Sequence, residues 1–208
     1  MNKITLKNAI IKNIQPSHTV NNIEYEKADL IVKRDDGKED LIDIRFKKFS
    51  NKYQENDKID LVGNIRSYSK KVSDNKNSVD LYVFTYFDSP EDKVEEEGKG
   101  NNIVEVDGRI CKISPLKITS EDKAYIHFIL ANNIIAPKSA KRINSYIPTI
   151  AWGDTAKFIS TLAVSDKVSI IGELQSREYK KRIGEGEDDF EIRVAKELVV
   201  KEIKKIED

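Results

Sequence analysis

The sequence predicts an all-β chain that folds as two successive five-stranded barrels, each with one short helix. Three observations support this fold class. Short runs of alternating apolar and polar residues, the period of a half-buried strand, cover most of the chain. An acidic stretch with almost nothing to bury divides the chain near its middle. The same order of strands, turns and breaks occurs on both sides of that stretch.

Composition restricts the class of protein. The 208 residues suit one large domain or two small ones, and no apolar run approaches the roughly 20 residues that span a bilayer. The N-terminus lacks the apolar segment of a signal peptide. Cys111, the single cysteine, can form no internal disulfide, so we expect a small strand residue in a reducing cytoplasm. The 36 basic residues balance 36 acidic ones, so nucleic-acid binding would need a local basic face.

The first half contains five segments with strand periodicity. They are residues 3–14, 23–34, 41–46, 59–67 and 79–87. We expect a bulge near Asn8, a break at residues 15–17, and a hairpin turn at 35–37, where Gly37 supplies a positive φ. Residues 47–56 are the one piece of this half suited to a helical turn or two, and residues 69–78 read as a polar loop.

The stretch 88–102 has a different composition from the rest of the chain. It holds six acidic residues, two glycines and one proline. Such a composition is typical of a linker, because it offers no apolar surface to bury. We therefore predict a linker at 89–101 between one domain at 1–88 and another at 102–208.

The strand pattern then restarts. Its segments are 101–113, 124–135, 146–152, 168–174 and 189–200. In the second of these, Tyr125, His127 and Ile129 share one face. Asp154 is expected to cap a short helix over 155–162, whose Ala156 and Ile159 face inward.

An internal repeat relates the two halves. VGNIRSY at 62–68 matches IGELQSREY at 171–179, and DKIDLVG at 57–63 matches DKVSIIG at 166–172. In this comparison Phe46 takes the place of Trp152, the only tryptophan. The repeat predicts a duplicated domain, with small differences in loop length.

Five short strands with a helix between the third and fourth are typical of an OB-fold, although another small barrel would also fit the pattern. The block YIPTIAWGDTAKFI carries an aromatic, a proline and an aromatic-Gly pair before the helix. The block DKVSIIGELQSREY carries a G-X-L-X-S-R-X-aromatic strand. In these blocks the C-terminal half resembles the bacterial single-stranded-DNA-binding protein family over most of residues 102–200. For residues 1–88 the resemblance rests on the repeat, so the chain resembles a tandem OB-fold variant.

The resemblance implies sequence-independent binding and protection of single-stranded DNA in replication, recombination or repair. Bases stack on aromatic rings and cations follow the phosphates in such binding. By similarity and by the repeat, the stacking residues would be Trp152, Tyr146, Tyr179, Phe46 and Tyr68. The phosphate-binding residues would be Arg177, Lys180, Lys181, Arg182, Lys138, Lys141, Arg142, Arg66, Lys70 and Lys71.

Each assignment has a simpler structural alternative. Trp152 is equally suited to a barrel core, and Tyr179 to packing at a sheet edge. The lysines and arginines are common surface residues. Tyr82, Phe84 and Tyr86 alternate on one face of a strand, where they form either a second stacking platform or, as we favour, an interface with another subunit.

No set of residues with catalytic or metal-ligand spacing is present, so we expect a binding protein that needs no cofactor or metal. Two other functions remain open. One is an OB-fold assembly module of a primosome, plasmid or phage replication complex that binds mainly protein. The other is binding of single-stranded RNA, because stacking does not read the sugar.

Two features depart from the family. The chain ends in VKEIKKIED, without the acidic, Phe-ending tail that housekeeping members use to recruit replication and repair enzymes. Recruitment by that route is therefore not expected. The usual member has one OB domain and forms a tetramer, so two domains per chain predict a homodimer with four barrels. Contact with a membrane is not expected.

Overall fold

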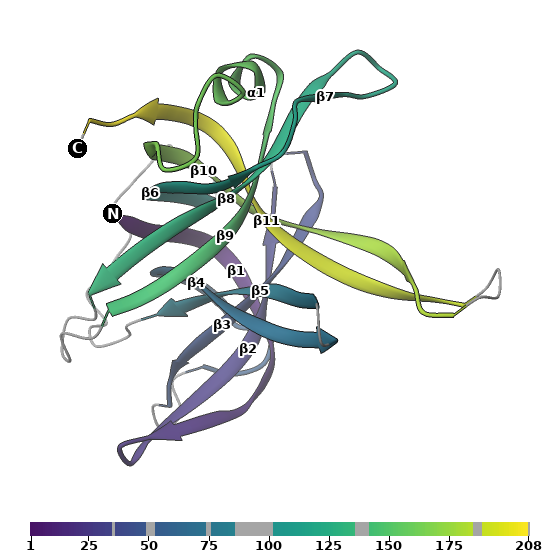
Figure 1. The fold of residues 1–208 in the computed structure, drawn as a ribbon. Helices are drawn as coiled ribbons and strands as arrows, with labels where there is room; N and C mark the ends of the chain where they lie inside the picture. Colours follow the sequence, from purple (N-terminus) through teal and green to yellow (C-terminus); the bar gives the residue numbers. More distant parts are fainter. Residues whose placement is uncertain are drawn as a thin grey trace.

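The computed structural model describes residues 1–34, 36–48, 53–73, 76–85, 102–135, 142–184 and 189–207, with backbone alone over 70–73 and 76–78. Its strands form one continuous 11-stranded sheet that closes into two barrels (Figure 1). The first barrel lies below the second in this view, and a long two-stranded hairpin projects from the second. Among the described residues, no helix is long and apolar enough to cross a membrane.

The first barrel consists of five strands. They are β1 (Asn2–Val20), β2 (Ile23–Lys33), β3 (Glu39–Lys47), β4 (Lys58–Ser73) and β5 (Lys76–Thr85). Neighbouring strands pair antiparallel, and a short parallel pairing of β3 with β5 closes the barrel. Alternate residues of each strand, such as Leu30, Val32, Ile42 and Ile44, are buried inside, as the period of two predicts.

The second barrel repeats this plan. Its elements are β6 (Asn102–Ile113), the two-residue β7 (Lys117–Ile118), β8 (Ala124–Ile135), β9 (Arg142–Trp152), α1 (Gly153–Ile159), β10 (Lys167–Arg182) and β11 (Phe190–Lys205). A short parallel pairing of β9 with β11 closes it, in the place of the β3–β5 pairing. The predicted all-β class with two OB-fold barrels is therefore confirmed. The proposed linker at 89–101 lies outside the described residues, so the domain limits stay a prediction.

The two barrels are joined edge to edge through β1 and β6. These strands pair antiparallel, with Asn2 opposite Val106, Ile4 opposite Val104 and Leu6 opposite Asn102. The pairing is symmetric about Ile4 and Val104, so an approximate two-fold axis relates the barrels. Neither edge strand is left with open hydrogen-bonding groups along this joint.

Several details differ from the predictions. β1 continues past Pro16 to Val20, because bulges accommodate the irregular residues and keep the strand paired with β2. The bulge near Asn8 is present, with Asn8 at a φ of 53°. Residues 69–73 extend β4 and residues 76–78 belong to β5, where the sequence predicted a loop.

The helix also differs. α1 begins at Gly153 and has Trp152 as its N-cap residue, so Asp154 lies inside the first turn and pairs with Lys157 instead of capping. The prediction that Ala156 and Ile159 face inward is confirmed. α1 is the single helix of the described residues. In the first half, part of the candidate helical segment, 49–52, lies outside them.

One buried asparagine in each barrel holds the start of its first strand to the interior of its fourth. The Asn102 amide donates from Nδ2 to the Leu174 carbonyl at 2.7 Å, and its Oδ1 accepts from the Leu174 N–H at 3.1 Å. Asn2 makes the same pair of bonds to Ile65, both at 2.9 Å. This repeated contact spans more than 60 residues and has no local sequence signal.

Replacing Asn102 by alanine should lower the free energy of unfolding by about 1–3 kcal/mol, because it leaves buried backbone groups of Leu174 without partners. Urea denaturation followed by circular dichroism measures this change. Asn144→Ala, at an exposed position of β9, is the matched control and should change stability by less than about 0.5 kcal/mol. Equal losses in both variants would contradict the structural role of Asn102.

Candidate nucleic-acid interface

The outward face of β8 and β9 in the second barrel carries a pair of aromatic rings in tilted contact. Tyr125 and Trp152 lie opposite each other in the two strands, with ring centroids 5.3 Å apart and planes 31° apart. Trp152 is 43% exposed, which excludes the alternative that it belongs to the barrel core. One face of a large π-system is therefore open to a flat ligand.

Next to this pair, Tyr125 contacts the His127 ring edge-on, at 5.6 Å and 87°. His127 in turn lies 3.9 Å from the Glu197 carboxylate of β11. Tyr146 shares the outward face of β9 with Trp152, six residues before it, and is exposed. At the rise of a strand these two rings are roughly 20 Å apart, so they serve different points of an extended ligand.

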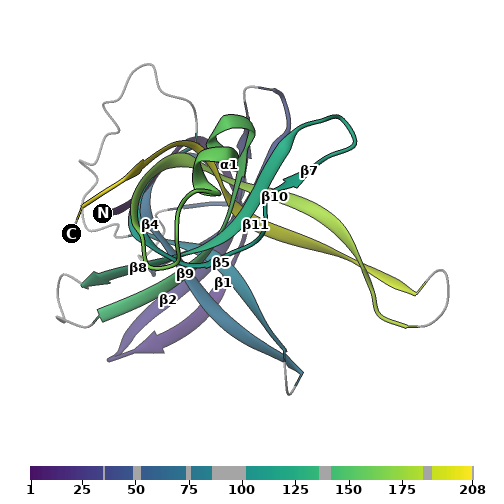
Figure 2. The same ribbon diagram turned by 45° about the horizontal axis from the view of Figure 1, so that its top comes forward.

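Tyr179 lies on the β10–β11 hairpin and is 38% exposed. The Arg177 guanidinium carbon lies 5.9 Å from its ring centroid, and Arg177 Nε lies 3.1 Å from Glu197 Oε1. The hairpin projects beyond the barrel in both views of the fold (Figure 1 and Figure 2). The exposed Tyr179 ring is thus available to a ligand that follows the hairpin, whereas Arg177 is paired with Glu197.

The basic run of the hairpin is divided between two faces, because successive residues of a strand point in opposite directions. Lys181 is on the same face of β10 as Arg177 and Tyr179, whereas Lys180 and Arg182 are on the opposite face. The Lys180 ammonium lies 4.3 Å from the ring centroid of Phe190. The predicted cations therefore do not form a single cluster.

The structure describes only some of the other predicted cations. Arg142 is exposed at the start of β9. Lys138 and Lys141 lie outside the described residues, as does Tyr86. The backbones of Lys70 and Lys71 belong to β4, opposite Ser78 and Asn77, but their side chains are not among those described.

Phe46 does not have the predicted role. Its side chain is 2% exposed and packs edge-on against Tyr53, with centroids 6.0 Å apart. Burial also raises the pKa of the Tyr53 phenol to about 12. A ring enclosed in this way cannot stack on a base, so the prediction of a stacking residue at Phe46 is wrong.

The strand register explains this error. Tyr25 lies opposite Lys47 in the first barrel, as Tyr125 lies opposite Trp152 in the second. Lys47 is therefore the structural counterpart of Trp152, and Phe46 corresponds to the buried Ala151. An offset of one residue moves a side chain to the other face of a sheet.

The first barrel presents a different outward face. The Arg45 guanidinium lies 4.0 Å from the ring centroid of Tyr82 and 4.9 Å from that of Tyr68. Arg66 lies 3.8 Å above Phe84. The predicted Tyr68 and Arg66 thus share one surface with Arg45, which the sequence analysis missed. Because Arg45 follows the buried Ile44 along β3, its side chain points outward.

Burial raises the pKa of the Tyr68 phenol, and its hydrogen bond to Asp80 at 3.0 Å adds to the effect. The phenol is therefore neutral at physiological pH and adds no negative charge to this surface. Burial also raises the pKa of the nearby Asp43 carboxyl, against the opposing effect of Lys196 at 2.6 Å. Lys196 belongs to β11, so this ion pair connects the two barrels.

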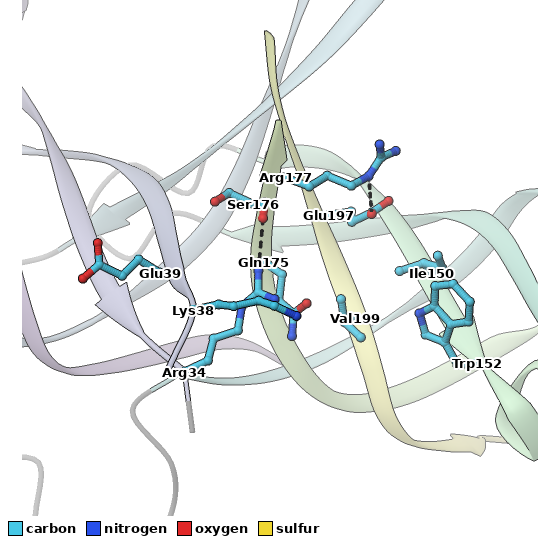
Figure 3. A pocket seen from close by; sticks show the side chains of 10 residues that line it. All are labelled: Arg34, Lys38, Glu39, Ile150, Trp152, Gln175, Ser176, Arg177, Glu197 and Val199. Carbon is cyan, nitrogen blue, oxygen red and sulfur yellow. Dashed lines mark hydrogen bonds and ion pairs between the residues drawn. The ribbon is translucent and has the colours of Figure 1, made fainter. Parts of the chain in front are cut away.

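A groove of about 540 Å³ lies between the barrels (Figure 3). One side is the β2–β3 hairpin of the first barrel, and the other is the Trp152 face of the second. The residues lining it are Arg34, Lys38, Glu39, Ile150, Trp152, Gln175, Ser176, Arg177, Glu197 and Val199. Within the described ranges, no three His, Cys, Asp or Glu side chains gather in a way that could hold a metal ion.

Comparisons with known proteins agree with this arrangement. Residues 101–203 match the model of the single-strand binding protein family. The structure resembles wild-type single-stranded DNA binding protein from Thermus aquaticus with a TM-score of 0.69 and 16% identity, over 100% of this chain and 94% of that one. A deletion mutant of the same protein gives 0.68 and 16%, over 100% and 96%. No curated protein matches the chain.

At this identity the two solved structures establish the fold over both barrels. The family match covers the barrel that carries the Tyr125–Trp152 pair. Members of the matched family are non-enzymatic DNA-binding proteins, which agrees with the expectation of a binding protein. Through residues 101–203, the chain therefore belongs to the single-strand binding protein family.

Proposed function

We propose that the chain binds single-stranded DNA in the cytoplasm without sequence preference and protects it during replication, recombination or repair. The observation that carries this proposal is the open, paired ring surface of Tyr125 and Trp152 in the barrel that matches the family. The solved structures that resemble the whole chain are also named for single-stranded DNA binding.

The chemistry of this surface suits a ligand whose sequence varies. Every base offers a π-face, and stacking on an aromatic residue contributes roughly 1–3 kcal/mol per base. Trp152, Tyr146 and Tyr179 provide three separate exposed rings, and Arg177, Lys181 and Arg142 lie on the same strands. A strand that crosses from β9 to the β10–β11 hairpin would meet rings and cations in turn.

We assign the first barrel a weaker part in binding. Its counterpart of Trp152 is Lys47, and Arg45 covers one face of both Tyr68 and Tyr82. This surface offers cations for phosphates and fewer open ring faces for bases. Tyr82 and Phe84 therefore contribute mainly as supports for Arg45 and Arg66.

Oligo-dT should quench the fluorescence of Trp152, because a stacked base lies against the indole. Titration at several salt concentrations should also show an affinity that falls as salt rises, since bound phosphates release counterions. The same titration with oligo-U measures preference for DNA over RNA. Absence of quenching together with no retention on a single-strand column would refute nucleic-acid binding and favour a protein-binding assembly module.

Trp152→Ala should weaken binding to oligo-dT by about 1–3 kcal/mol, the contribution of one stacked base, and leave the fold intact. Anisotropy of a labelled oligonucleotide measures affinity, and thermal denaturation monitors the fold. The matched control is Phe158→Ala, which removes an aromatic ring of equal exposure (42%) from α1, outside the groove. A similar loss of affinity in both variants would argue against a specific stacking role.

We further propose a homodimer, so that two chains supply four barrels. The outer face of the joint sheet supports this: the half-buried Val62 and Ile103 flank the buried Thr5 across β4, β1 and β6, and Ile171 is exposed in the next row. Such a row of mainly apolar side chains suits contact with a second copy.

Light scattering should give about 48 kDa, twice the 23.8 kDa of one chain. Ile171→Asp should reduce the mass to that of the monomer, because it places a charge in the proposed contact. Ile118→Asp, at an exposed position of β7, should leave the dimer unchanged. A wild-type chain that is monomeric at micromolar concentration would contradict the proposal.

A further inference from the structure

We propose that the two barrels jointly form one nucleotide subsite, in which the first barrel supplies the phosphate contact for a base stacked on Trp152. This inference rests on the proposed binding of single-stranded DNA. The site is the groove between the β2–β3 hairpin and the outward face of the second barrel (Figure 3). Its occupant is one nucleotide of a bound single strand.

The second barrel provides the apolar side of this groove. Figure 3 shows the Trp152 ring beside Ile150, with Val199 between them and the hairpin of the first barrel. Gln175 lies across from Trp152. Its Nε2 donates to Glu173 Oε2 at 2.8 Å, and its Oε1 can accept a hydrogen bond from a base edge. The volume of about 540 Å³ lies in the range of roughly 300–1,000 Å³ typical of small-ligand pockets.

The hairpin of the first barrel is fixed in place by a buried carboxylate. Arg34 donates from Nε to Asp40 Oδ2 at 2.7 Å and from Nη2 to the Ser176 carbonyl at 3.1 Å. Asp40 Oδ1 also accepts from the Ser176 N–H at 2.6 Å. The Leu41 N–H donates to Ser176 Oγ at 2.8 Å. These contacts bind the hairpin to β10, so both sides of the groove are held together before a ligand arrives.

The charges identify Lys38 as the cation that is available to a phosphate. Arg34 is engaged by Asp40, and Arg177 by Glu197. Lys38 lies 3.3 Å from Asp36, with side chains 72% and 52% exposed, and such an exposed pair contributes little. Glu39, the other acid lining the groove, lies 3.9 Å from Lys33. The Lys38 ammonium can therefore turn from Asp36 to a phosphate at little cost.

Three observations favour a nucleotide over an acidic peptide as the occupant. The apolar side is a flat indole, which suits a base. The groove adjoins the Tyr125–Trp152 pair, because Trp152 belongs to both. The cation lies across the groove from the indole, as the base and phosphate of one nucleotide require (Figure 3).

The experiment compares the full chain with Lys38→Glu, Lys38→Gln and the matched control Lys33→Glu, using oligo-dT. Lys33 is on the same hairpin and 66% exposed, but it does not line the groove. Lys38→Glu should weaken binding about tenfold and Lys38→Gln about threefold, whereas Lys33→Glu should change it less than twofold. The slope of log affinity against log salt should decrease in magnitude by about 0.7 for Lys38→Gln, the value for one lost phosphate contact to a single strand.

The outcomes separate the two proposals. If the wild type binds oligo-dT with quenching of Trp152, but Lys38→Glu and Lys33→Glu have equal effects, the shared subsite is refuted and the binding function stands. An unchanged salt slope in Lys38→Gln would refute it as well. If the wild type does not bind oligo-dT, both proposals fail. Because Lys38 is an exposed hairpin residue, unchanged thermal denaturation of its variants should show that loss of affinity is not loss of fold.

Discussion

The antiparallel pairing of β1 with β6 is the constraint on which the rest of the structure depends. It joins the edges of two barrels into one sheet and relates them by an approximate two-fold axis. That geometry brings the β2–β3 hairpin of the first barrel to β10 of the second. It also brings β9 to β4, where the Tyr146 N–H donates to Ser67 Oγ at 2.7 Å. The groove beside Trp152 exists because this joint holds both of its sides.

The two barrels share a framework and differ in the surface it displays. Gly63 and Gly172 occupy equivalent positions, and a Cβ at Gly172 would lie 2.3 Å from the Val199 carbonyl oxygen. The close approach of the strands is thus preserved in both copies. On the outward face, Tyr25 of the first barrel corresponds to Tyr125 of the second. The residue opposite the tyrosine differs: it is Lys47 in the first barrel and Trp152 in the second. The second barrel has an exposed indole where the first has an aliphatic cation, which supports the proposed unequal division of binding.

Much of the fold could be predicted from the sequence, because period-two alternation and the internal repeat are local signals. The positions of exposed Trp152 and Tyr179 followed from the family blocks. Phe46 was matched to Trp152 because the two sequence blocks can be aligned with an offset of one residue. In a strand, that offset moves the side chain to the opposite face of the sheet. Contacts such as Asn2 with Ile65, or Asp40 with Ser176, join distant segments and leave no pattern in either one. The shared groove depends on those contacts, so only the structure could reveal it.

The covalent connection between the barrels changes how their pairing responds to concentration. Two separate chains paired through such an edge would dissociate on dilution, whereas the partners here are held at a high effective concentration and always in equal number. Along the β1–β6 joint, each barrel therefore pairs only with the other barrel of its own chain, and a substitution on one side can be compensated on the other. Barrels that pair as identical copies cannot diverge in this way, because every change appears on both sides at once. The tandem arrangement therefore allows the surface of one barrel to change without the same change in the other.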